Sequence, residues 1–223
     1  QENWQNGDTY KVNGRIYKLK LDTKSFGDTS WTYLIGDETW GGAASKNGKY
    51  VTYLLNQGGI DQSNPNIDWL VIIDGTTGKK IWGSGGNLGT TNYQGLEVGM
   101  NYDGKYFAIG ATEWGTITLF QNNHAVNGQS TVTKLWEYNC NGQVRKIVFT
   151  DDGQYVYAGS GDMFLRKFKV SDGTLVWKAY IGGWPFVNGF QFSKDSNYIY
   201  TGAKSFDMTR IDAKTGQVMW KDF

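Results

Sequence analysis

The chain has 223 residues, 39% of them hydrophobic, which is enough for one sizeable domain or two small ones. Its formal net charge is +1 with no block of like charges, and this argues against long-range attraction to nucleic acid or to an anionic membrane. No apolar run reaches the roughly 18 residues that span a bilayer. Cys140 is the single cysteine, so an internal disulfide is excluded. The 31 glycines and abundant aromatic residues favour short strands joined by tight turns.

Two series of aromatic residues divide the chain into repeats. A tyrosine follows a short polar turn sequence five times, at Tyr10, Tyr50, Tyr106, Tyr155 and Tyr198. A tryptophan follows each of them, at Trp31, Trp82, Trp136, Trp177 and Trp220. Periodic self-similarity of this length is typical of repeat architectures.

Taken in chain order, the first unit (1–35) lacks an opening strand, and four units follow at 36–87, 88–139, 140–182 and 183–223. The fourth unit resolves into "QVRKIVFT", "QYVYAGS", "FLRKFKV" and "TLVWKAY", with Asp-Gly turns after the first and third segments. The alternating apolar residues and these turns predict four antiparallel strands in each complete unit. The sequence therefore predicts an all-β fold, a β-propeller of four-stranded blades.

The turn between the third and fourth strands carries a repeated motif. The stretches "IDGTTGKKIW" (73–82) and "IDAKTGQVMW" (211–220) share Asp, Thr, Gly and Trp at fixed spacing. We expect the Asp to accept hydrogen bonds from turn amides and the Gly to supply a positive φ. The Trp should pack between adjacent blades.

This motif resembles the tryptophan-docking motif of quinoprotein-like propellers, the PQQ-dependent dehydrogenase-like superfamily, within the broader group of WD-repeat-like folds. The resemblance covers nearly the whole chain as a repeat, and it implies a structural role for the motif. The residues concerned are Asp74, Thr77, Gly78, Trp82, Gly173, Trp177, Asp212, Thr215, Gly216 and Trp220.

The sequence accounts for about four and a half blades. Propellers of the family that it resembles have seven or eight blades. We therefore expect an open arc, either part of a longer ring or closed by another chain. The alternative is a closed five-bladed ring with one incomplete blade.

The resemblance raises the question of whether this chain is an enzyme. It implies a quinone held over a Trp, with a hard cation, an Asp base and commonly a disulfide between adjacent cysteines. Glu97 and Asn101 could contribute to such a cation site, but they lie in an ordinary first strand, the sequence indicates no further ligands, and the disulfide is excluded. We therefore expect no catalytic residues, no cofactor and no metal. His124, without a Cys or His partner at ligand spacing, is expected to be a solvated loop residue.

Binding is expected on the loops that enter each blade and join its second and third strands. Aromatic rings beside acidic groups suit a sugar or a peptide. The candidates are Asp37, Glu38, Trp40, Asp61, Glu113, Trp114, Asp162 and Trp184, with the insertion 56–68 as the best contact loop.

The main hypothesis is a non-catalytic scaffold that binds a protein partner, or further blades of the same or another chain. A carbohydrate- or peptide-binding face and a segment of a quinoprotein dehydrogenase are the alternatives. An extracellular, surface or periplasmic location is favoured by the composition and by the habit of the family that the chain resembles. We expect neither nucleic acid binding nor a membrane span.

Overall fold

Strands in this chain pair with their neighbours in sequence, as short turns require. The computed structural model describes residues 15–19, 29–34, 39–55, 68–85, 95–111, 115–182, 189–202 and 208–222. In these ranges the strands form one two-stranded and four four-stranded antiparallel sheets, called blades 1 to 5 in chain order.

The blades are made of the following strands. Blade 1 contains β1 (Arg15–Leu19) and β2 (Thr29–Leu34). Blade 2 contains β3 (Thr39–Ala44), β4 (Tyr50–Leu55), β5 (Leu70–Asp74) and β6 (Lys80–Gly83). Blade 3 contains β7 (Gly95–Met100), β8 (Tyr106–Ala111), β9 (Thr116–Asn122) and β10 (Val132–Asn139). Blade 4 contains β11 (Val144–Phe149), β12 (Tyr155–Ser160), β13 (Phe164–Lys169) and β14 (Leu175–Tyr180). Blade 5 contains β15 (Gly189–Phe192), β16 (Tyr198–Gly202), β17 (Met208–Asp212) and β18 (Val218–Asp222).

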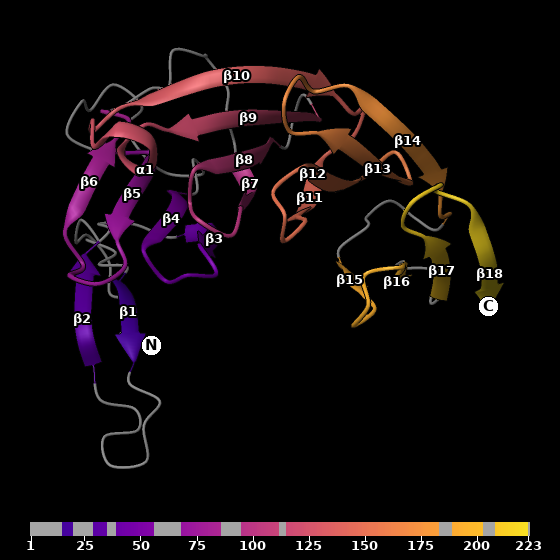
Figure 1. The fold of residues 1–223 in the computed structure, drawn as a ribbon, viewed down its shortest axis with the longest axis horizontal. Coiled ribbons are helices and arrows are strands. Elements are labelled where there is room, and N and C mark those ends of the chain that lie inside the picture. The colour runs from indigo at the N-terminus through magenta and orange to yellow at the C-terminus, as the bar shows by residue number, and fades with distance from the viewer. Residues whose placement is uncertain are drawn as a thin grey trace, which may run out of the picture.

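The blades follow one another around an open arc (Figure 1). On the inner side, the first strand β7 contacts both β3 and β11, and β10 and β14 run along the outer side. Blade 1 and blade 5 lie at opposite ends of the arc. The predicted fold class, an open arc of propeller blades, is confirmed, and the alternative of a closed five-bladed ring is not what the described residues form.

Burial differs between the middle and the outer strands of a blade. In blade 4, five consecutive residues of β12 are buried, although side chains alternate between the two faces of a strand. Along the outer strand β14, exposed residues instead alternate with partly buried or buried ones. A middle strand is buried on both faces because its sheet is stacked between two neighbouring sheets.

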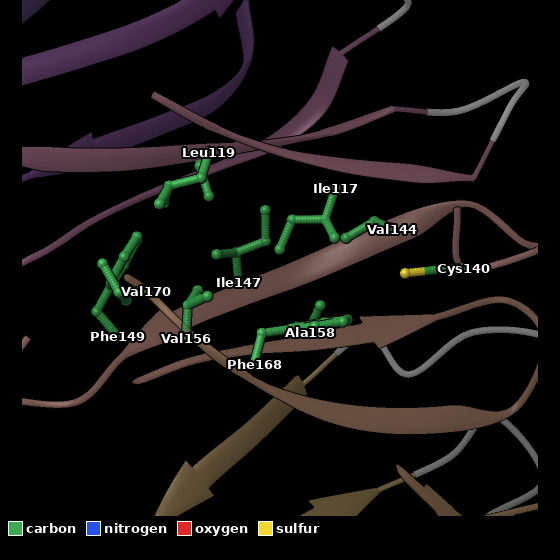
Figure 2. Close-up of a cluster of buried hydrophobic side chains, with 11 residues drawn as sticks. Ile117, Leu119, Cys140, Val144, Ile147, Phe149, Val156, Ala158, Phe168 and Val170 are labelled. Atoms are coloured by element: carbon green, nitrogen blue, oxygen red, sulfur yellow. The ribbon is translucent and has the colours of Figure 1, made fainter. Parts of the chain in front are cut away.

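An apolar cluster fills each of the four seams between consecutive blades. The cluster between blades 3 and 4 combines Leu119 of β9, Ile147 and Phe149 of β11, and Val156 of β12 (Figure 2). Cys140 lies in the same cluster, fully buried, and burial raises the pKa of its thiol to about 12. The thiol therefore serves as a small apolar side chain in this core.

One short helix, which the sequence does not predict, interrupts blade 3. The helix α1 (His124–Asn127) lies in the insertion between β9 and β10 and ends at Gly128, whose φ is +79°. Four residues make a single turn, too short to give a periodic apolar pattern. Within the described ranges, no helix has the length and apolarity needed to cross a membrane.

Candidate functional site

The third-to-fourth-strand turn of blade 2 is organised by one carboxylate. Asp74 Oδ1 accepts hydrogen bonds from the amides of Thr76 and Thr77, both at 2.8 Å. The bond from the Thr77 amide is the largest cause that lowers the pKa of Asp74. Gly78 closes the turn with a φ of +73°. The carboxylate therefore stays ionised as the acceptor at the centre of the turn.

Blade 5 repeats the arrangement. Asp212 Oδ1 accepts from the amides of Lys214 and Thr215, at 3.0 and 2.7 Å, and from the Thr215 hydroxyl at 2.9 Å. The Thr215 amide is the main cause that lowers the pKa of Asp212. Gly216 has a φ of +77°. In blade 4, Gly173 has a φ of +74° although Lys169 stands in the Asp position.

Each of these glycines lies against a tryptophan ring of the preceding blade. A Cβ atom at the glycine would come within 2.6–2.8 Å of ring atoms. The pairs are Gly78 with Trp31, Gly173 with Trp136, and Gly216 with Trp177. A glycine is therefore required twice over, for the positive φ and for the close approach of the ring.

Two of the three tryptophans also donate a hydrogen bond across the seam. Trp31 Nε1 donates to the carbonyl of Gly75 at 3.1 Å, and Trp136 Nε1 donates to the carbonyl of Val170 at 2.9 Å. Gly75 and Val170 occupy the same position, three residues before the turn glycine. This carbonyl is thus the common acceptor of the turn.

The seam between blades 4 and 5 uses other donors for that carbonyl. Ala213, which corresponds to Gly75, accepts from Tyr157 Oη and from Lys167 Nζ, both at 3.1 Å. The Nε1 of Trp177 is buried and has no hydrogen-bond partner among the described residues. Burial lowers the pKa of Lys167, an effect opposed by the charges of Asp152 and Asp212. The Trp–Gly contact is kept here, but its hydrogen bond is replaced.

The seam between blades 2 and 3 departs further from the pattern of a Trp ring against a glycine turn. Trp82 packs into the apolar cluster that joins blades 2 and 3, whose members include Phe107 and Phe120. In the place of a glycine turn, blade 3 carries the insertion with α1. His124 of that helix is half-buried, and its Nδ1 lies 3.3 Å from Tyr50 Oη. The expectation of a solvated loop residue is therefore wrong for His124.

A cation on the strand that pairs with the tryptophan-bearing strand is the feature that sequence reasoning missed. Lys18, Lys167 and Arg210 each pair, on the neighbouring strand, with the tryptophan of their blade. Lys18 Nζ donates to the carbonyl of Gly75 at 2.8 Å, as Lys167 does to Ala213. The signal in the sequence is a basic residue ten to thirteen positions before the Trp, which stands out only once the strand register is known.

Asp162 is the one predicted binding residue whose side chain the structure describes. Arg166, only 3% exposed, contacts Asp162 through both terminal nitrogens and donates to Ser160 Oγ at 2.6 Å. Burial raises the pKa of Asp162, but the hydrogen bonds from Arg166 and Ser160 outweigh it and the pKa lies below its usual value. This carboxylate is engaged in a local ion pair.

The other predicted binding residues are not brought together by the described part of the structure. Trp40 belongs to β3, but its side chain is outside the described residues. Also outside them are Asp37, Glu38, Asp61, Glu113, Trp114, Trp184 and nearly all of the insertion 56–68. Their role in binding stays a prediction.

The two candidate ligands of a quinone-type site are engaged elsewhere. Glu97 lies 3.4 Å from Lys146 Nζ, and burial raises the pKa of its carboxyl against the opposing charge of that lysine. Asn101 Oδ1 accepts from the amide of Tyr106 at 3.0 Å. Among the described side chains, no three His, Cys, Asp or Glu residues gather as metal ligands would. The described residues therefore do not fit such a site.

Comparison with known proteins gives a family and a fold. A PQQ-type family model, described as "Outer membrane protein assembly factor BamB", matches residues 68–223. No curated protein matches the chain. The crystal structure of BamB from Moraxella catarrhalis aligns with a TM-score of 0.66 and 17% sequence identity, over 93% of this chain. The alignment covers 58% of that protein, so this chain spans little more than half its length. The expected resemblance to quinoprotein-like propellers is confirmed at the level of family and fold.

Gly173 tests the Trp–Gly contact, with Gly48 as a matched control. Both have φ above +70°, but a Cβ at Gly173 would meet the Trp136 ring at 2.8 Å, whereas a Cβ at Gly48 would meet no atom within 4 Å. We expect Gly48→Ala to lower the free energy of unfolding in urea by about 1–2 kcal/mol from backbone strain alone. Gly173→Ala should lower it by a further ~1–3 kcal/mol. Equal losses would contradict the contact.

Two Trp→Phe variants measure how much the hydrogen bond from Trp136 to Val170 contributes to stability. Trp136→Phe removes the donor to Val170, whereas Trp177→Phe removes an Nε1 that has no described partner. Trp136→Phe should therefore cost about 1 kcal/mol more in the free energy of unfolding. A larger loss in Trp177→Phe would show that the two seams are not held as described.

Asp162 should be important for stability. Asp162→Asn leaves the buried Arg166 without its charged partner, and we expect the free energy of unfolding to fall by about 3 kcal/mol. Asp151, 72% exposed and paired with Lys46, is the control, since Asp151→Asn should cost less than about 1 kcal/mol.

The same variants test the pH dependence. The folded pKa of Asp162 lies below the ordinary value of 3.8, so its stabilisation is complete above that value and is lost as pH falls through the folded pKa. Acid unfolding measured below about pH 4 should therefore depend less on pH in Asp162→Asn than in the parent chain. An unchanged acid profile would contradict this assignment.

Proposed function

This chain belongs to the family described as "Outer membrane protein assembly factor BamB", and from that premise we propose that it is a non-catalytic propeller scaffold that holds protein partners together during outer membrane protein assembly. The match over residues 68–223 is the observation that carries the proposal. The proposal includes a location in the periplasm or at the cell surface, because the family description refers to the assembly of outer membrane proteins.

The way that the described polar groups are used supports a scaffold. Asp74 and Asp212 organise turns, Asp162 is paired with Arg166, and Glu97 is paired with Lys146. A catalytic centre would need several such groups directed at a shared substrate position. In the described ranges these carboxylates instead stabilise blades and seams, which leaves the outer strands and the loops for contacts.

The repeated seam motif fits the same role. We propose that the Trp–Gly contacts are the docking devices that keep the arc rigid, so that binding surfaces on several blades keep a fixed spacing. A rigid surface binds with a smaller loss of conformational entropy than a flexible one.

Cross-linking in the cells that produce the chain tests this function. A photo-reactive residue placed at Leu135 or Val176, both exposed on outer strands, should give adducts with proteins of the outer membrane or of its assembly machinery. The same residue at buried Val156 is the control and should give none. Absence of adducts from every exposed position tried on blades 3 to 5 would overturn the scaffold, as would turnover of a quinone-linked substrate by the purified chain.

A further inference from the structure

Three Asn-Gly dipeptides lie entirely within the described ranges, and their surroundings differ. They are 47–48 in the turn between β3 and β4, 127–128 at the end of α1, and 141–142 in the connection from β10 to β11. An asparagine followed by glycine is chemically labile, because the glycine amide nitrogen is shielded by no side chain and can attack the asparagine carboxamide carbon. In a folded chain, the attack requires that this nitrogen and this carboxamide are free to meet.

The turn between β3 and β4 holds both reacting groups of its dipeptide. Asn47 Oδ1 accepts hydrogen bonds from Ser45 Oγ at 2.8 Å and from the Lys49 amide at 3.0 Å. The Gly48 amide donates to the carbonyl of Ser45 at 2.9 Å. Attack on the carboxamide would have to break these bonds, so the turn protects Asn47.

The end of α1 protects Asn127 in the same way. The Gly128 amide donates to the carbonyl of His124 at 3.1 Å and closes the helical turn. The Asn127 carboxamide is held through both of its polar atoms. Its Oδ1 accepts from the Gln129 amide at 3.0 Å, and its Nδ2 donates to Gln129 Oε1 at 3.2 Å.

Asn141 lacks both restraints. Among the described residues, neither its carboxamide nor the Gly142 amide has a hydrogen-bond partner. The backbone amide of Asn141 donates to Asn139 Oδ1 at 2.7 Å, which leaves the Asn141 side chain free. Asn141 is exposed, so water reaches its carboxamide. Its φ of +58° is left-handed, so the rotation that ring closure needs disrupts no strand or helix.

We propose that Asn141 is a site of spontaneous deamidation, which converts it to aspartate and isoaspartate. The Gly142 nitrogen bonds to Asn141 Cγ, and the carboxamide nitrogen leaves as ammonia together with the proton of the Gly142 amide. The product of this step is a cyclic succinimide. Water then opens the ring, giving its hydroxyl to one of the two carbonyl carbons and its other proton to the nitrogen. Opening at Cγ gives aspartate, and opening at the backbone carbonyl gives isoaspartate.

The two products should affect the seam between blades 3 and 4 differently. Aspartate adds a negative charge at an exposed position and leaves the main chain unchanged. Isoaspartate adds a methylene to the main chain of a tightly packed connection. The Cys140 amide donates to the carbonyl of Gly115 at 2.7 Å, and a Cβ at Gly142 would lie 2.4 Å from the Asp162 amide nitrogen. We therefore expect isoaspartate, and not aspartate, to destabilise this seam.

Incubation of the purified 223-residue chain at mildly alkaline pH, followed by digestion and peptide mass mapping, tests the proposal. The peptide with Asn141 should gain the mass difference between a carboxamide and a carboxyl group. We expect this at least about ten times faster than in the peptides with Asn47 or Asn127, because hydrogen bonds that must break raise the barrier there. Synthetic peptides with aspartate or isoaspartate serve as chromatographic standards for the products.

The same chain unfolded in urea is the control. All three dipeptides lose their surroundings there, and their rates of deamidation should become similar. Ser45→Ala is a matched variant, because it removes one hydrogen bond to Asn47 Oδ1. It should speed deamidation at Asn47 and leave the rate at Asn141 unchanged.

Asn141→Asp separates the added charge from the longer main chain. The freshly purified variant should unfold at the same urea concentration as the parent chain, whereas the incubated parent chain, enriched in isoaspartate, should unfold at a lower one. Equal losses in both would contradict the effect assigned to the main chain. Deamidation at Asn141 that is no faster than at Asn47 and Asn127 in the folded chain would overturn the proposal. An order of rates that persists in urea would also overturn it, since the sequence rather than the structure would then set the rates.

Discussion

The structure depends on the burial of both faces of each four-stranded sheet. A single blade of this chain has apolar residues on both sides of its middle strands, so it cannot shield them from water alone. Stacking between two neighbours solves this problem for blades 2, 3 and 4, and each fully buried Leu, Ile or Phe side chain contributes about 1.5–3 kcal/mol. The arc is the arrangement in which every seam has one continuous apolar cluster.

At three of the four seams, polar contacts at the outer corner fix the position of the blades that apolar burial brings together. Apolar burial is not directional. The hydrogen bond from Trp31 or Trp136 to a carbonyl, and the close contact of a Trp ring that leaves room only for glycine, define one relative placement of the blades. The seam between blades 4 and 5 reaches the same placement with Lys167 and Tyr157 as donors. These three seams therefore keep the same Trp–Gly contact while the hydrogen-bond donor changes.

The structural use of the polar groups bears on function. Carboxylates that could have served a catalytic centre are engaged in turns and ion pairs, and the membership of the chain in an outer membrane assembly family fits a protein whose task is to present surfaces.

The sequence by itself determined the fold class, the strand pattern of each unit and the turn chemistry of Asp74, Gly78, Asp212 and Gly216. These features are local, because turn geometry and strand alternation depend on residues a few positions apart. The sequence did not reveal the role of Lys167, the half-buried place of His124 or the change of donor at Ala213. Those depend on which strands pair and on which blade faces which, and only the tertiary structure decides that, because the partners lie on other strands or on the neighbouring blade.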